Sequence, residues 1–93
     1  TQPRTAHLAQ ALIESFAAHE VPLLTRPLRR AGVSVLKAPD IPSVLIELGF
    51  LSSPRDLARL RDEEGRARIA VALRAALTAW RDADAARAGL VRQ

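Results

Sequence analysis

The apolar positions of the chain predict one helix near its start, two short strands in its middle and two helices in its second half. In residues 5–18 the large apolar side chains recur at the spacing of an amphipathic helix. They are Leu8, Leu12, Ile13 and Phe16. Thr5 is a suitable N-cap, and Pro22 ends the pattern because the residue before a proline avoids the helical conformation.

Two apolar runs, residues 33–36 and 43–48, predict strands. In the second run, Val-Leu-Ile at 44–46 shows no alternation, which is typical of a strand buried on both faces of a sheet. The link of residues 37–42 holds two prolines, so we expect it to be stiff and extended. A parallel crossover needs a dozen or more residues, so the short link favours antiparallel or edge-adjacent strands without deciding the direction.

A second helix start follows the strands. Ser53 supplies a capping oxygen, Pro54 takes the first helical position and Asp56 lies at the third. We expect Leu57 and Leu60 to pack this short helix against the sheet.

Acidic residues at 62–64 open the last helix, where the helix dipole favours negative charge. Its predicted buried stripe contains Ile69, Ala70, Leu73, Ala76, Leu77 and Trp80. Beyond Trp80 the pattern fades, and we expect residues 82–93 to fray or to be disordered. The predicted order is helix–strand–strand–helix–helix, of the α/β class.

Length and composition limit the possible architectures. Ninety-three residues form one small domain at most. The chain has no cysteine, so neither a disulfide framework nor a thiolate metal site is available. No apolar run approaches the roughly 20 residues of a transmembrane segment. Because Thr1 is not a natural start, we expect that an upstream segment has been removed or left out.

The formal net charge of +4 raises the question of an anionic partner. The arginines are spread along the helices, and Trp80 is the only large stacking residue besides Phe16 and Phe50. Nucleic-acid modules more often combine clustered basic residues with interleaved aromatic ones, so we expect no nucleic-acid partner. The connector of residues 21–30 carries three arginines and leaves two interpretations open: a solvated loop, or a site for an anionic glycan or a partner.

One carboxylate, Glu47, lies at the predicted carboxyl end of the second strand. Burying a charge costs several kcal/mol unless it is paired, protonated or bound to a metal. Glu47 is therefore either part of a structural ion pair or an acid–base group at the rim of a site. Open α/β sheets bind ligands beyond the carboxyl ends of their strands, and Gly49 permits a sharp turn or a close approach to a ligand. Spacing alone leaves both interpretations of Glu47 open.

The two histidines do not predict a metal site. His7 and His19 are twelve residues apart in or next to one helix, so they lie about 120° apart around its axis. They are not able to bind one metal ion together, and surface histidines are the better interpretation.

Residues 42–53 have the sequence PSVLIELGFLSS. This sequence resembles the signature P-S-V-L-x-E-x-G-F-x-S-N of zinc-dependent N-acetylmuramoyl-L-alanine amidases of the Amidase_3 type, which are bacterial cell-wall enzymes. The resemblance extends from about residue 1 to residue 80. Ser53 replaces the final Asn of the signature, but both residues are strong N-caps. The resemblance implies that Glu47 faces the zinc and is catalytic.

The resemblance also implies that residues 1–81 are the carboxyl-terminal portion of the amidase catalytic domain, completing a mixed sheet flanked by helices. The family's zinc ligands, a His-Glu-His set, lie in motifs similar to D-P-G-H-G and S-x-H-A, and neither motif occurs here. We therefore expect the upstream part of the domain to bind the Zn²⁺. We expect this chain alone to bind no catalytic zinc and to be inactive.

The function implied by the resemblance is peptidoglycan hydrolysis in the periplasm or outside the cell, as in cell division. The bond cleaved joins N-acetylmuramic acid to the L-alanine of the stem peptide. The implied partners are peptidoglycan, the upstream part of the domain and an activator protein. Two alternatives remain. One is a catalytically incompetent binding or regulatory module with Glu47 in a structural ion pair, and the other is a small nucleic-acid binder, which the scattered charge disfavours.

Overall fold

The computed structural model describes residues 3–23, 33–37 and 40–92. Its elements are α1 (Pro3–Ala18), β1 (Val33–Val35), β2 (Val44–Ile46), α2 (Pro54–Arg61) and α3 (Glu63–Arg92). The predicted order helix–strand–strand–helix–helix is therefore confirmed. The arginines of the connector lie outside the described residues, and both interpretations of that cluster stay predictions.

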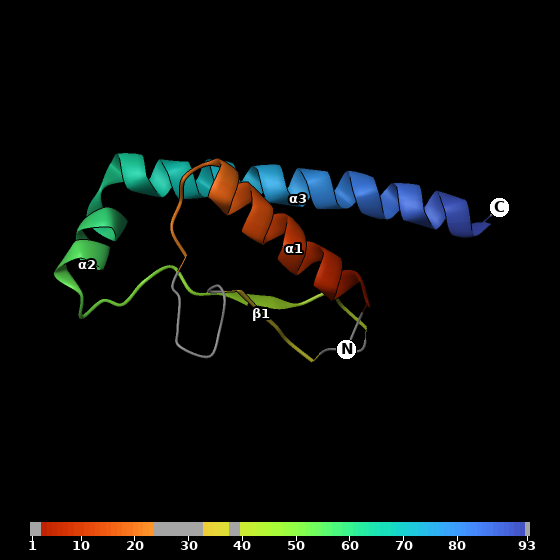
Figure 1. Cartoon of the computed structure of the whole chain (residues 1–93), viewed down its shortest axis with the longest axis horizontal. Coiled ribbons are helices and arrows are strands. Elements are labelled where there is room, and N and C mark those ends of the chain that lie inside the picture. The colour runs from red at the N-terminus through yellow and green to blue at the C-terminus, as the bar shows by residue number, and fades with distance from the viewer. Residues whose placement is uncertain (1–2, 24–32, 38–39, 93) are drawn as a thin grey trace.

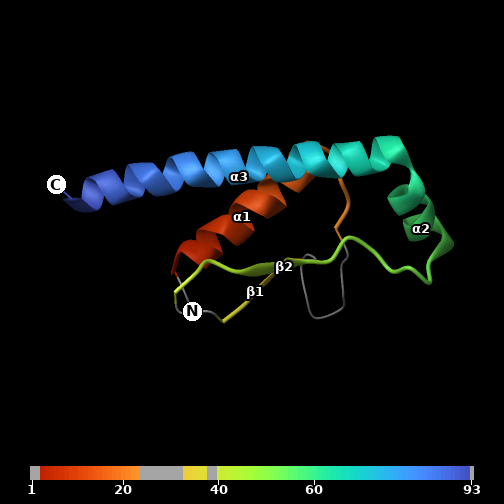
Figure 2. The same cartoon turned by 180° about the vertical axis from the view of Figure 1, so that it is seen from behind.

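The elements form layers, with α1 lying between α3 and the two strands (Figures 1 and 2). The core lies where α1 meets α3. It contains Leu8, Leu12, Phe16, Val21, Ala72 and Ala76. Three of the four apolar positions predicted for α1 are buried, and Ile13 is half-buried. Burying each large side chain stabilises the fold by about 1.5–3 kcal/mol, and the small Ala72 and Ala76 let the two helices approach closely.

Thr5 does not cap α1, so the N-cap prediction is wrong. The helix already begins at Pro3, which suits the first turn because its missing N–H has no helical partner there. Thr5 lies inside the helix and is fully buried. Its Oγ1 accepts a hydrogen bond of 3.2 Å from the backbone N–H of Ser43, just before β2. The hydroxyl thus joins α1 to the strands.

The two strands pair antiparallel, the direction that the short link favoured. Val33 lies opposite Ile46, and Val35 lies opposite Val44. Val44 and Ile46 pack against the core, whereas Leu45 is 49% exposed. The prediction that this strand is buried on both faces is therefore wrong, because the described helices cover only the α1 side. Both strands are also shorter than predicted.

The sheet of the described residues consists of these two strands. The larger mixed sheet flanked by helices is not seen in this part of the chain and stays a prediction. Counted by residues, the fold is mostly helical.

The start of α2 agrees with its sequence prediction. The backbone N–H of Asp56 donates to the Oγ of Ser53 at 3.3 Å, and Pro54 occupies the first helical position. The packing prediction for this helix is wrong. Within the described residues α2 contacts α3 and neither strand, because the chain carries it to the start of α3, away from β1 and β2 (Figure 1).

The buried stripe of α3 is narrower than predicted. Ile69, Leu73, Ala76 and Trp80 contact the core as expected, and Ala72 joins them. Ala70 and Leu77 are exposed, because they lie about 40–60° beyond Leu73, which is at the edge of the face that meets α1.

Residues 82–92 continue α3 without a break, so the prediction that they fray or are disordered is wrong for this range. Two features support the extension. The segment is rich in alanine, the strongest helix former, and Asp84 is paired with Arg4 of α1.

Candidate functional site

Glu47 follows Ile46 directly, at the carboxyl end of β2, as the sequence predicted. The residue is half-buried. On its amino-terminal side, Ile46 is paired with Val33 in the ladder. On its carboxyl-terminal side, Leu48 packs against the hydrophobic core. Ordered chain therefore holds Glu47 on both sides.

Gly49 lies close to Asp56, the third residue of α2. A Cβ added to Gly49 would lie 3.0 Å from the Cβ of Asp56 and 3.2 Å from its Oδ2. Such contacts are tighter than nine in ten of those made by real Cβ atoms, so a side chain at Gly49 would require Asp56 to move by a few tenths of an ångström. The backbone of Gly49 has no positive φ. The close approach seen here is to a side chain of the same chain, so the expected sharp turn or approach to a ligand stays a prediction.

Asp56 connects this segment to α2. It is only 7% exposed, and its Oδ2 accepts a hydrogen bond of 3.0 Å from the backbone N–H of Phe50. Its Oδ1 lies 2.8 Å from the Nη2 of Arg59 in an ion pair. The N–H of Ser53 donates to the backbone oxygen of Phe50 at 3.1 Å, which closes the turn. A buried carboxylate needs such partners, and here they join the chain after Glu47 to a helix start.

The sequence analysis identified Asp56 only as an acidic residue in the first turn of a helix. In a capping box the third helical residue reaches back to the N–H of the N-cap. Here that N–H bonds to Phe50, and the Asp56 carboxylate reaches three residues further back. The sequence carries no specific signal for this contact, because it depends on the path of the turn between Phe50 and Ser53.

A shallow cavity of about 330 Å³ lies beside this contact. Its lining includes Leu48, Gly49, Phe50, Arg55 and Asp56, so the turn after Glu47 forms one of its walls. Glu47 itself does not line this cavity.

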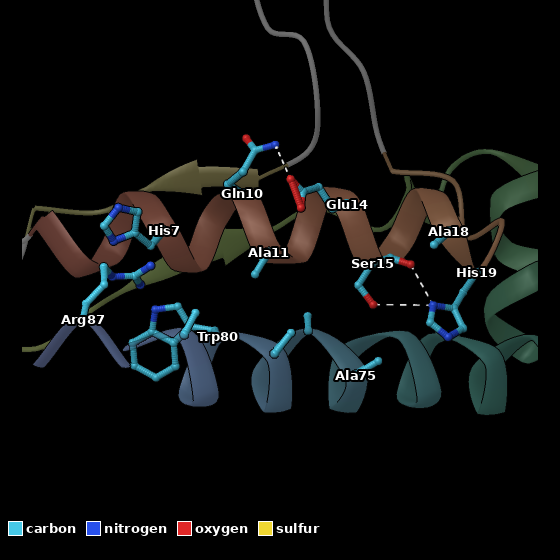
Figure 3. Close-up of a pocket in the computed structure, with 13 residues that line it drawn as sticks. His7, Gln10, Ala11, Glu14, Ser15, Ala18, His19, Ala75, Trp80 and Arg87 are labelled. Atoms are coloured by element: carbon cyan, nitrogen blue, oxygen red, sulfur yellow. Dashed lines mark hydrogen bonds between the residues drawn. The ribbon is translucent and has the colours of Figure 1, made fainter. Parts of the chain in front are cut away.

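A larger groove of about 530 Å³ runs along the contact between α1 and α3 and is lined by residues of both helices (Figure 3). Alanines such as Ala11 and Ala75 line its middle, and His7 and His19 lie near its opposite ends. His7 is exposed, as predicted, whereas His19 is half-buried. The Nδ1 of His19 lies 2.8 Å from the backbone oxygen of Ser15, and the hydroxyl of Ser15 donates to the backbone oxygen of Ala72 at 2.6 Å. The structure therefore does not bring the histidines together.

Catalytic zinc takes three protein ligands and one water. Within residues 3–23, 33–37 and 40–92, no group of three His, Cys, Asp or Glu side chains is placed to bind a metal ion. The described residues therefore do not fit a zinc site by themselves. None of the described helices has the length and hydrophobicity needed to cross a membrane.

Residues 1–79, which include Glu47 and Asp56, match the protein family described as N-acetylmuramoyl-L-alanine amidase. The chain is similar to the probable N-acetylmuramoyl-L-alanine amidase AmiB of Haemophilus influenzae, with 38% identity over 74 residues, 78% of this chain and 17% of that protein. It is also similar to the N-acetylmuramoyl-L-alanine amidase AmiC of Escherichia coli, with 37% identity over 51 residues, 55% of this chain and 12% of that protein. The chain thus spans less than a fifth of the length of these relatives. No solved structure gives a significant match.

Proposed function

Since the chain belongs to the Amidase_3 family of N-acetylmuramoyl-L-alanine amidases, we propose that its protein is a peptidoglycan hydrolase in which Glu47 is the general acid and base. The substrate bond is the amide between N-acetylmuramic acid and the L-alanine of the stem peptide. The observation that supports the role of Glu47 is its position. It is a half-buried carboxylate directly after β2, within the matched residues and held by ordered chain on both sides.

In the proposed reaction, the carboxylate of Glu47 accepts a proton from the attacking water as the C–O bond forms. It then delivers this proton to the nitrogen of L-alanine as the C–N bond breaks. The products are the lactyl carboxylic acid of the sugar and a free amine. A positioned carboxylate is suited to both proton transfers, because it changes roles by gaining and losing one proton.

We assign the zinc ligands of this family to the upstream part of the catalytic domain, because the described residues of this chain do not fit such a site. No step assigned to Glu47 requires this chain to hold the metal. Since the substrate is the cell wall, we propose that the protein acts in the periplasm or outside the cell.

The test is Glu47→Gln in the complete catalytic domain that contains this chain. Glutamine keeps the shape of the side chain and removes its basicity, so turnover on peptidoglycan should fall about 10²–10⁴-fold. The matched control is Glu63→Gln at the exposed start of α3, which should retain normal turnover. Zinc content and the thermal midpoint should be unchanged in both variants. Near-normal turnover of a folded, zinc-replete Glu47→Gln enzyme would reject the assignment and favour the structural ion pair.

A further inference from the structure

We propose that Asp56 is a positioning residue for Glu47, acting through the backbone of Gly49 and Phe50. This inference rests on the proposed catalytic role of Glu47. It adds a residue that makes no contact with the substrate in the proposed reaction and that determines where the catalytic carboxylate lies.

The chain before Glu47 is fixed independently of Asp56. Ile46 is paired with Val33, and the N–H of Ser43 is bonded to the buried hydroxyl of Thr5. The path of the backbone on the carboxyl-terminal side of Glu47 depends on the residues that follow it.

The chain after Glu47 leaves the ladder at once, and Gly49 and Phe50 belong to neither a helix nor a strand. Leu48 contributes apolar packing, which has little directional preference. The hydrogen bond from the N–H of Phe50 to Asp56 is directional and lies three residues beyond Glu47. The same side chain also lies close to Gly49, where a Cβ would be 3.0 Å from the Cβ of Asp56, so Asp56 restricts this backbone at two neighbouring residues.

Asp56 is itself rigidly held. Its own N–H is bonded to Ser53, its second carboxylate oxygen is paired with Arg59, and α2 packs on α3. Through Asp56 and α2, these contacts fix the position of the turn relative to α3 as well as relative to the strand pair.

A purely structural role for Asp56 predicts a loss of stability without a specific loss of catalysis. A positioning role predicts a lower kcat in enzyme that remains folded, because a displacement of about 1 Å in a catalytic group is enough to cost about 10²-fold. Asp56→Ala should therefore lower kcat about 10–100-fold and leave KM within about threefold.

Two further variants test whether the loss of kcat comes from the contact of Asp56 with the Gly49–Phe50 backbone. Asp56→Asn retains an oxygen that accepts from Phe50 and should recover kcat to within about fivefold of the wild type. Gly49→Ala should lower kcat less than Asp56→Ala does, because its new Cβ requires the Asp56 side chain to move by only a few tenths of an ångström. The matched control is Asp84→Ala, which removes another Asp–Arg pair, on α3, and should leave kcat unchanged.

The deciding measurement combines Asp56→Ala with Glu47→Gln in the complete catalytic domain. If Asp56 acts through Glu47, adding Asp56→Ala to the Glu47→Gln enzyme should change kcat less than about twofold. An equal loss in both backgrounds overturns the inference, and so does wild-type kcat in folded Asp56→Ala enzyme while Glu47→Gln is inactive. Near-normal turnover of Glu47→Gln alone would instead reject the proposed function. Amide exchange of Phe50 in the 93-residue chain tests the tether separately: Asp56→Ala should accelerate it about 10-fold or more, and unchanged exchange overturns the inference.

Discussion

Thr5 shows how much a single buried hydroxyl does in this fold. Local sequence suggested a helix cap, but the side chain is fully buried and accepts the N–H of Ser43, a residue 38 positions away. The bond sets where the strands lie against α1. A residue whose partner is so distant in sequence has no local signature, which is why the local interpretation was wrong.

Thr5→Val should destabilise the chain by about 1–3 kcal/mol, because valine has a similar shape but leaves the N–H of Ser43 without its acceptor. Thr5→Ser keeps the acceptor and should lose less. Chemical denaturation of the 93-residue chain measures both, with Thr78→Val on the exposed face of α3 as the control. Equal free energies of unfolding for Thr5→Val and wild type would show that the bond contributes nothing.

At the scale of elements, the ends of α1 and α3 are joined by a cluster around Arg4. Its Nη2 lies 2.8 Å from Oδ2 of Asp84, and its Nε donates to Oδ1 of the same carboxylate at 2.8 Å. The guanidinium lies 5.3 Å from the ring centre of Trp80, whose Nε1–H donates to the backbone oxygen of Arg4 at 3.2 Å. This bidentate pair is the strong form of an Arg–carboxylate contact and supports the helical extension of α3 beyond Trp80.

The Arg4 cluster should make stability depend on pH. The hydrogen bond from Arg4 lowers the pKa of Asp84 below its ordinary value of 3.8, against the opposing effect of partial burial. A lowered carboxyl pKa stabilises the fold above the ordinary value, and this stabilisation is lost as the pH falls through the folded-state pKa.

The difference in thermal midpoint between wild type and Asp84→Asn should therefore be constant near neutral pH and shrink in acid, below about pH 4. Asp82→Asn is the control, because the Asp82 carboxylate is 68% exposed and its contact with the neighbouring Arg81 is longer, at 3.4 Å, than the 2.8 Å contact of Asp84 with Arg4. A difference that persists undiminished at about pH 2 would contradict this account.

Element order, the cap at Ser53 and three of the four apolar positions of α1 followed from the sequence, because each depends on neighbours within a few residues. Three other properties did not follow from the sequence: the exposure of Leu77, the packing of α2 and the length of α3. Each depends on which element, distant in sequence, packs against the helix. The site divides in the same way. Glu47 was placed at the end of its strand by local pattern, whereas the Asp56–Phe50 contact needs the three-dimensional path of the turn.

At the scale of the whole molecule, the chain is elongated, measuring 52 × 27 × 19 Å. It has one small core between α1 and α3, and one face of its strand pair is uncovered by the described helices. Such a unit carries the candidate acid–base residue but no described group of three metal ligands.

We therefore predict that the isolated 93-residue chain neither binds zinc stoichiometrically nor releases peptidoglycan fragments. Elemental analysis after zinc loading, and a dye-release assay with the complete catalytic domain as the positive control, measure the two properties. One zinc per chain bound with micromolar or higher affinity would contradict the prediction.

The distance in sequence between the two faces of the core has a consequence for biosynthesis. Ser15 and Ala72, which are bonded across the α1–α3 contact, are 57 residues apart. At a translation rate of about 5–20 residues per second, the apolar face of α1 waits roughly 3–11 s for its covering helix to be made. Throughout that interval Leu12 and Phe16, almost fully buried in the finished fold, have no α3 to cover them. Within this chain, the apolar face of α1 is therefore synthesised before the helix that covers it.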